Sequence, residues 1–269
     1  MNNTPTRTTL AAIVLIFTAA TLLVGAGTLV ATPSASAFPY NKGQDASNKN
    51  DNTGTIQYYT GTSSDIMASG NRNPVVFPPN SHPYGLTYGQ WSTEWWQWAV
   101  SIPSSNSPIT DTTGENCDVN QQGKVWFLAG TTGNPINKPV MRTCTIPVGK
   151  AILFPIINGE CSTAEGNGDT EAELRACAKS QMDGVTFLQA SIDGVPLKNL
   201  KMFRAASPLY KFTAVEDNPF GIPAGTTNSV ADGFWVMLPP LRPGTHTISF
   251  GGSIGSFSTS VEYELEIVR

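Results

Sequence analysis

Apolar and polar residues alternate strictly over residues 261–267, within a segment that spans 257–268. The apolar positions are Val261, Tyr263, Leu265 and Ile267, and the polar positions between them are Glu262, Glu264 and Glu266. A period of two places successive side chains on opposite faces of a β-strand. One face of this strand is therefore expected to be buried and the other to meet water, as in an antiparallel sheet.

Several other segments are rich in β-branched and aromatic residues and are separated by Gly, Pro and Asn, which is the pattern of strands and turns. These segments are 125–129, 151–157, 185–192, 234–238 and 245–250. Asp193-Gly194 and Pro243-Gly244 have the composition of tight turns. Strands that follow one another without intervening helices predict a mainly β fold, an antiparallel β-sandwich of jelly-roll or immunoglobulin-like type.

Two segments, 87–102 and 170–182, carry the periodicity and end signals of helices. In the first, Trp91, Trp95 and Trp98 recur on one stripe, and further apolar residues lie on the opposite side. The second begins with a Thr followed three residues later by Glu, the spacing of a capping box. We therefore expect two helices packed on the sandwich, the first of them covered on both sides.

The first predicted helix also carries the candidate ligand site. Exposed tryptophan rings stack on sugar faces, and four of them within eight residues suggest a carbohydrate-binding surface. The alternative is that the tryptophans at helical spacing are core side chains, which leaves Trp96 the least constrained. The predicted ligand-binding residues are Trp96 and the polar strip Gln90, Glu94 and Gln97, and the expected ligand is a glycan or another cell-envelope partner.

The first 37 residues have the features of an export signal. Residues 10–30 are nearly all apolar or small, and Ala35 and Ala37 give the small-x-small pattern that signal peptidase needs. The apolar stretch is also long enough to span a bilayer, so an uncleaved N-terminal anchor is the alternative to cleavage after Ala37. In either case the protein is expected to be extracellular or at the cell surface, with membrane contact only through residues 1–37.

Composition divides the remainder into a polar, flexible lead-in over 38–80 and one domain over 81–269. Charged residues make up 13% of the chain, about half of the usual ~25%. The formal net charge of -4 offers no basic footprint for nucleic acid and no polybasic patch for acidic lipids. These features are common in exported β proteins and exclude nucleic acid as an expected partner.

Four cysteines, Cys117, Cys144, Cys161 and Cys177, lie in the predicted exported domain. An even number of cysteines in an oxidising compartment predicts disulfides, for which three pairings exist. We expect Cys117 to pair with Cys144 and Cys161 with Cys177, because these pairings close two local loops. A zinc site is the alternative, but no C-x-x-C pair occurs and the two histidines are far apart in sequence.

Two carboxylates and one histidine are candidates for catalysis. Glu94 flanks the tryptophan stripe and Glu160 follows an apolar strand, so the pair could serve as acid and base on a glycoside. His246 is expected to point inward, where it could exchange a proton with Asp232 or Glu94. The alternatives are a buried and hydrogen-bonded Glu, a loop Glu, and a core histidine with one hydrogen bond. No nucleophile elbow, P-loop, dinucleotide fingerprint or H-E-x-x-H motif occurs.

Calcium is the alternative to the expectation that the protein holds no metal or cofactor. The acidic loops 165–173 and 216–218 carry oxygen ligands of the right type, although neither has the spacing of an EF-hand. Capping of the second helix explains Asp169 and Glu173 equally well. Ligand type alone therefore supports calcium in these loops.

Four groups of segments occur together in the chain: Gly89-Gln90-Trp91 with Trp95-Trp96-Gln97-Trp98, Val125 to Gly130, Gly149 to Asn158, and Asp232 to His246. Over Tyr84 to Arg269 they resemble an uncharacterised family of exported bacterial and archaeal proteins. The resemblance implies an exported β domain and supplies no catalytic residue. We therefore expect an exported, non-catalytic protein that binds a ligand or partner. The alternatives are a carbohydrate-active enzyme that uses Glu94 and Glu160, and a structural component of the cell envelope.

Overall fold

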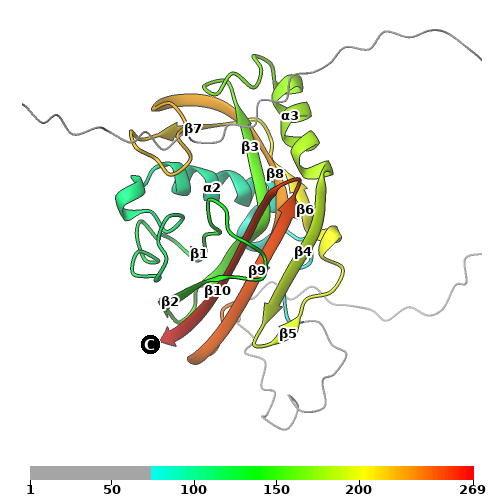
Figure 1. Ribbon diagram of the computed structural model, residues 1–269. Helices are drawn as coiled ribbons and strands as arrows, with labels where there is room; N and C mark the ends of the chain where they lie inside the picture. The colour runs from blue at the N-terminus through cyan, green and yellow to red at the C-terminus, as the bar shows by residue number, and fades with distance from the viewer. Residues whose placement is uncertain (1–73) are drawn as a thin grey trace, which may run out of the picture. The chain divides into compact units, whose positions relative to one another are not determined.

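The computed structural model describes residues 74–269 (Figure 1). The predicted signal or anchor, residues 1–37, lies outside the described residues, as does the predicted lead-in as far as residue 73. Within residues 74–269, no helix has the length and apolar character needed to cross a membrane.

The described chain forms two five-stranded sheets, as expected of a mainly β fold with two layers (Figure 1). Sheet A contains, in order, β1 (Val125–Phe127), β3 (Ala151–Ser162), β8 (Gly225–Leu238) and β6 (Arg204–Ala206), and β7 (Tyr210–Ala214) also pairs with β8. Sheet B contains, in order, β2 (Val140–Pro147), β10 (Phe257–Val268), β9 (Gly244–Ile254), β4 (Val185–Ile192) and β5 (Val195–Pro196). Neighbouring strands are antiparallel except for two parallel pairs, β1 with β3 and β2 with β10.

The two sheets enclose one core, and sheet A carries a second core on its other face. Phe154 of β3 stacks on Phe250 of β9 between the sheets, with ring centroids 4.6 Å apart. Leu153 and Trp235 point to the opposite side, into the second core. A sheet covered on both faces requires apolar residues at successive positions, which explains the unbroken apolar run of β3. On β10 the alternating burial confirms the expected strand with one wet face.

The second core lies under helix α2 (Tyr88–Val100), whose N-terminus has the capping box of Thr87 and Gln90. Trp95 and Trp98 are 2% and 6% exposed and pack against sheet A, which confirms that this helix is covered. Helix α3 (Glu171–Asp183) begins with the expected capping box and packs by its apolar stripe against the ends of β3 and β8. Three short 3-10 helices complete the fold: η1 (Pro83–Gly85), η2 (Ser104–Asn106) and η3 (Leu200–Phe203).

Both expected disulfides are present. Cys117 is bonded to Cys144 and Cys161 to Cys177, at sequence separations of 27 and 16 residues. The first ties the loop before β1 to β2, and the second ties the end of β3 to α3. No free cysteine is found within residues 74–269. Disulfides of this kind are typical of an oxidising environment.

Replacing both Cys161 and Cys177 with alanine is expected to lower the free energy of unfolding by about 3 kcal/mol, because the loop of 16 residues is no longer closed in the unfolded chain. Chemical unfolding in urea measures the loss. The double alanine variant at Cys117 and Cys144 provides a comparison, because its longer loop predicts an equal or slightly larger loss. Variants that unfold at the same urea concentration as the parent protein would contradict this expectation.

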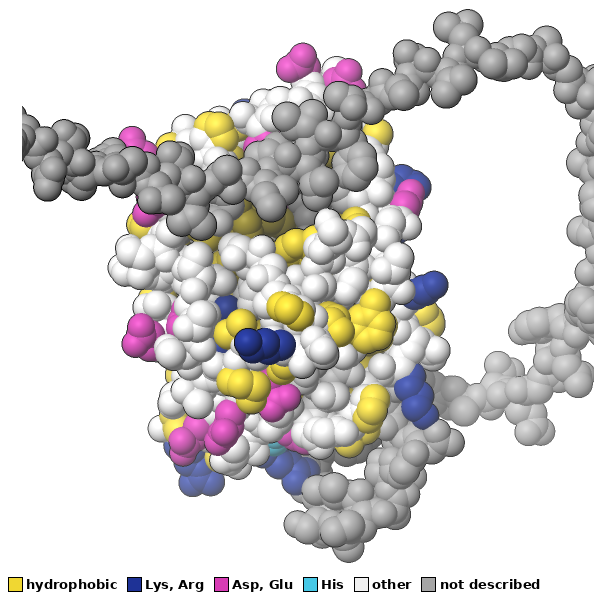
Figure 2. All heavy atoms as spheres, in the orientation of Figure 1, with side chains coloured by type: hydrophobic (Ala, Val, Ile, Leu, Met, Phe, Trp, Pro, Cys, Tyr) yellow, Lys and Arg dark blue, Asp and Glu magenta, His cyan; other side chains and the backbone are white. Residues whose placement is uncertain are grey.

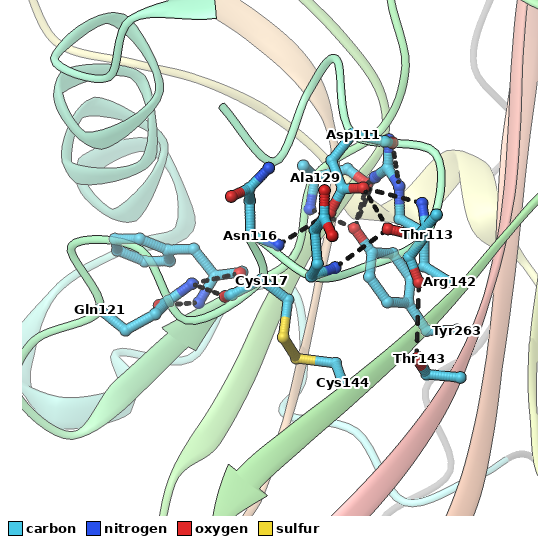
Figure 3. Close-up of a disulfide and its surroundings, with 12 residues drawn as sticks. Asp111, Thr113, Asn116, Cys117, Gln121, Ala129, Arg142, Thr143, Cys144 and Tyr263 are labelled. Carbon is cyan, nitrogen blue, oxygen red and sulfur yellow. Dashed lines mark hydrogen bonds between the residues drawn. A yellow bond between two sulfur atoms is a disulfide. The ribbon is translucent and has the colours of Figure 1, made fainter. Parts of the chain in front are cut away.

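A buried arginine of sheet B holds the loops before and after β1. Arg142 of β2 points into the protein and is 2% exposed. Its guanidinium donates to five oxygens: the carbonyls of Ile109, Asp111, Ala129 and Gly130 and the hydroxyl of Tyr263. Figure 3 shows Asp111, Ala129 and Tyr263 gathered around Arg142. The bond to Tyr263 is 2.6 Å long, and the guanidinium carbon lies 5.4 Å from the centre of that ring. Carbonyl oxygens and an aromatic ring therefore solvate this charge inside the protein.

Candidate functional site

The predicted tryptophan platform is part of the protein core. The Trp96 side chain is 5% exposed and lies between Trp95 and Phe220, with ring centroids 5.3 Å and 5.0 Å away. Trp91 is partly buried, and its indole N–H donates to the Pro83 carbonyl at 2.8 Å. Trp96, the one tryptophan among the predicted ligand-binding residues, therefore offers no free face on which a sugar could stack.

The polar strip beside the tryptophans is largely occupied by structural contacts. Gln90 closes the capping box at the start of α2. Gln97 exchanges two hydrogen bonds with the backbone of Thr213 and so joins α2 to β7. Glu94 is exposed to water. Glu160 is buried on β3, and no hydrogen bond joins it to Glu94 within the described chain.

Glu160 instead belongs to a group of oxygen-bearing side chains that we call the carboxyl cluster, in which Glu160 is buried and Glu165 is exposed. Its members are Glu160, Ser162, Glu165, Tyr210 and Ser229. The Ser229 hydroxyl donates to Glu160, and the Ser162 hydroxyl donates to Glu165 at 2.8 Å. The cluster therefore joins β3, β7 and β8 to the turn that follows β3.

Burial is the main cause of the unusual titration in the carboxyl cluster. Together with the adjacent Glu165 carboxylate, burial holds the pKa of Glu160 well above its usual range. The pKa of the Tyr210 phenol is likewise raised by burial and by the negative charge of Glu160. Raised pKa values of this kind are a feature of acid–base sites and also of purely structural carboxyl pairs. Glu160 lines neither of the two grooves described below.

His246 has a different partner from those expected. It lies opposite Leu265 in the register of β9 and β10, and it is half-buried as its position predicts. Its Nδ1 is 2.9 Å from the Asp193 carboxylate, and its Nε2 is 3.1 Å from the Arg242 carbonyl. The hydrogen bond to Asp193 raises the pKa of His246. The predicted pairing with Asp232 or Glu94 is therefore wrong, and His246 fixes the hairpin between β4 and β5.

The loops considered for calcium also have structural contacts. Glu173 accepts hydrogen bonds from the backbone of Asp169 and Thr170, as a helix cap does. Asn218 binds backbone atoms of Val215 and Ile222 within its own loop. No three His, Cys, Asp or Glu side chains converge as a metal site anywhere between residues 74 and 269.

A groove lies between β4 and η3. Its volume is about 760 Å³, within the range of small-molecule sites. The lining residues are Met182, Asp183, Val185, Thr186, Phe187, Leu188, Leu197, Asn199, Leu200, Lys201, Met202, Arg204 and Phe234. Phe187 and Met202 are 42% and 66% exposed, and hydrophobic side chains are visible over β4 (Figure 2). We call this feature the apolar groove.

Ion pairs close the polar end of the apolar groove. The Arg204 guanidinium lies 2.7 Å from Asp183 and 2.7 Å from Asp232. Lys179 also pairs with Asp183. Because its partners neutralise Arg204, this end offers hydrogen-bonding groups but no unpaired arginine for an anionic ligand.

A second groove is acidic and lies beside the Cys117–Cys144 disulfide. Its volume is about 350 Å³, and four of its lining residues are Glu115, Asp118, Glu264 and Glu266. Acidic side chains gather near the C-terminal end of β10, where this groove lies (Figure 2). None of these four carboxyls belongs to the carboxyl cluster.

The apolar groove was missed in the sequence because its residues come from a predicted core strand. On β4, Ala190 and Ile192 face the core between the sheets. Phe187 has the opposite parity and therefore points outward. Phe187, an aromatic residue at an outward position of β4, is the sequence feature that indicates the groove. It can be recognised only when the buried face of the strand is known.

No family model, curated protein or solved structure matches the chain. Function is therefore inferred from the geometry of the described residues. The resemblance of the four groups of segments to exported proteins stays a prediction.

Proposed function

We propose that the protein is an exported, non-catalytic binding protein that holds a small apolar molecule in the apolar groove. The observation that carries this proposal is the exposure of Phe187 and Met202 on the walls of a groove of about 760 Å³. Exposed apolar side chains that gather around a concave surface are typical of a site that a ligand covers. A few polar groups at one end would orient the bound molecule.

Export is supported by the two disulfides, which persist outside the reducing cytoplasm. The export signal predicted over residues 1–37 supports the same location, extracellular or at the cell surface. An apolar molecule is poorly soluble in water, so a carrier or sensor outside the cell is a fitting role for such a groove. A cell-envelope lipid or a released apolar metabolite is the class of ligand that this chemistry fits.

A binding role accounts for the groove better than catalysis does. Its polar end consists of Arg204 with Asp183 and Asp232, whose charges are already paired. Paired groups hold a ligand by hydrogen bonds but are poor at exchanging protons with it. The carbohydrate-active alternative loses its geometric support, because Glu94 is exposed and Glu160 is buried in the carboxyl cluster.

The neutral dye N-phenyl-1-naphthylamine, whose emission rises in apolar surroundings, tests the proposal in a titration of the purified protein. Replacing Met202 with serine is expected to weaken dye binding about tenfold, since a buried side chain of this size contributes ~1.5–3 kcal/mol. Met141, which is 56% exposed and lies outside the groove, provides the matched control. Dye binding that is absent in the parent protein, or equally weakened by Met141→Ser, would contradict the proposal.

A further inference from the structure

A row of aromatic side chains that are not fully buried runs from the segment before α2 to β1, and we call it the aromatic row. Tyr84 of η1 lies between Phe77 and Trp91, with ring centroids 6.2 Å and 6.5 Å away. Trp91 in turn lies 6.4 Å from Phe127 of β1. All three contacts are T-shaped, an arrangement that aromatic pairs prefer. These contacts hold the Tyr84 ring in place while 42% of the residue stays exposed.

The backbone holds Tyr84 in a strained conformation. Its φ of 55° and ψ of 26° lie in the left-handed region, which a bulky residue rarely adopts. The Trp91 indole N–H fixes this turn by donating to the Pro83 carbonyl at 2.8 Å. Strained residues persist where the surrounding structure imposes them, and they cluster at sites that hold ligands. An exposed aromatic ring that is presented at a cost in backbone energy therefore indicates a binding role.

A carboxylate without a partner lies beside the aromatic row. Glu94 is exposed, and within residues 74–269 it takes part in no hydrogen bond or ion pair. It follows Trp91 by three positions on α2, so the two side chains are neighbours on the helix surface. A helical side chain leans toward the N-terminus of its helix, which directs the Glu94 carboxylate over the turn that carries Trp91. The Tyr84 hydroxyl also has no hydrogen-bond partner in the described chain.

We propose that Tyr84, Trp91 and Glu94 form a binding site for a β-linked glycan whose hexopyranose rings carry equatorial hydroxyls. Equatorial hydroxyls leave the C–H groups of the sugar on its two faces, and such faces stack on exposed aromatic rings. The hydroxyls at the edge of the sugar can donate to the Glu94 carboxylate, and hydrogen bonds to an ionised acceptor are strong. A chain of these sugars is extended and flat, which suits an open row of rings.

The aromatic row is a different surface from the tryptophan platform expected from the sequence. Trp96 was the expected ring and is buried, whereas Tyr84 precedes the helix and reaches Trp91 only through the turn of η1. Tyr84, Trp91 and Glu94 line neither the apolar groove nor the acidic groove. The glycan site therefore does not depend on the function proposed for the apolar groove.

An NMR titration of the isotope-labelled full-length protein with cellopentaose, a β-1,4-linked glucose chain, tests this site. We expect the indole N–H signal of Trp91 to shift and Tyr84→Ser to weaken binding about tenfold, because the stacking ring is lost. Tyr84→Phe keeps the ring and should bind within about twofold of the parent protein. Glu94→Gln removes the charged acceptor and should weaken binding about threefold.

Two matched controls accompany the titration. Maltopentaose has the same composition as cellopentaose, but its α-linkages coil the chain, so it should bind at least about tenfold more weakly. Met141→Ser changes a residue that is 56% exposed and lies in neither groove, and it should bind cellopentaose as the parent protein does.

Either of two results would overturn the proposal. One is a parent protein that binds cellopentaose no better than maltopentaose, or binds neither sugar. The other is binding by Tyr84→Ser that is as tight as that of the parent protein. Should Tyr84→Ser fail to fold, unchanged binding by Glu94→Gln, which alters only an exposed side chain, would count against the site in its place. Dye binding by the same variants reports on the apolar groove, so the two proposals can fail separately.

Discussion

Replacing Arg142 with methionine is expected to lower the free energy of unfolding by about 3–5 kcal/mol. Methionine fills much of the same space but donates no hydrogen bond, so the carbonyls of Ile109, Asp111 and Gly130 lose a donor inside the protein. The Ala129 carbonyl still accepts from the Tyr263 hydroxyl. Each buried polar group left without a partner costs about 1–3 kcal/mol. Since small domains are stable by only 5–15 kcal/mol, the variant is expected to retain a small part of the parent's stability. Urea unfolding followed by circular dichroism measures the loss.

Two further arginine variants separate hydrogen bonding from charge. Arg142→Lys keeps the charge but has a single nitrogen in place of the guanidinium fork, so we expect an intermediate loss. Arg175→Met is the control, because Arg175 is half-exposed and pairs with Glu171 on the surface of α3. That surface pair is expected to contribute less than ~1 kcal/mol. Equal effects at Arg142 and Arg175 would show that the buried network does not hold the loop before β1 in place.

Glu160→Gln is expected to change how stability depends on pH. The folded protein raises the pKa of Glu160, so it holds a proton that the unfolded chain has released. The stabilising contribution of this group is therefore complete below the ordinary Glu pKa of ~4.3 and is lost as the pH rises through the folded value. Over that range the parent protein should lose up to about 1.4 kcal/mol per pH unit. Glutamine does not titrate, so the variant should lack this slope.

Urea unfolding between pH 5 and 8, in EDTA to exclude divalent cations, measures the two pH profiles. His246, whose pKa is also raised, loses its stabilising contribution as the pH increases, but it does so in both proteins. The difference between the profiles is therefore assigned to Glu160. Glu94→Gln should retain the slope of the parent protein, because Glu94 is exposed. Parallel profiles for the parent protein and Glu160→Gln would mean that Glu160 is ionised in the folded state.

Strands whose inward-facing side chains are all apolar could be predicted from the sequence. Strands with polar side chains at inward-facing positions could not. The boundaries expected for 185–192 and 257–268 agree with β4 and β10. β2 was missed because Arg142 occupies an inward position between Val140 and Cys144, which breaks the apolar alternation. The first half of β8 was missed for a related reason, since Thr227 and Ser229 are buried polar residues there. The two parallel strand pairs depend on long-range packing that local pattern does not record.

In the candidate sites too, features that depend on local periodicity were predicted, and features that depend on contacts between distant segments were not. The helical spacing of the tryptophans predicted that α2 is a core helix, and the burial of Trp95 and Trp98 confirms it. Glu160 was singled out by its place after an apolar strand, but its neighbour is Glu165 and not Glu94. The pairing with Glu165 arises from a turn that folds back on β3, and the apolar groove arises where η3 leaves one side of β4 uncovered. Neither arrangement is encoded in a short stretch of residues.

The position of β10 inside sheet B, next to the edge strand β2, has a consequence for the order in which the chain folds. β10 lies between β2 and β9, and Val140 of β2 pairs with Val261 of β10, more than a hundred residues away along the chain. β2 therefore cannot join sheet B until residues 257–268 are available to pair with it. Contacts between such distant segments close slowly, because the entropy of a long loop is lost before the pairing stabilises it. The parallel pairing of β2 with β10 should thus form late in folding, after the local hairpin of β9 and β10.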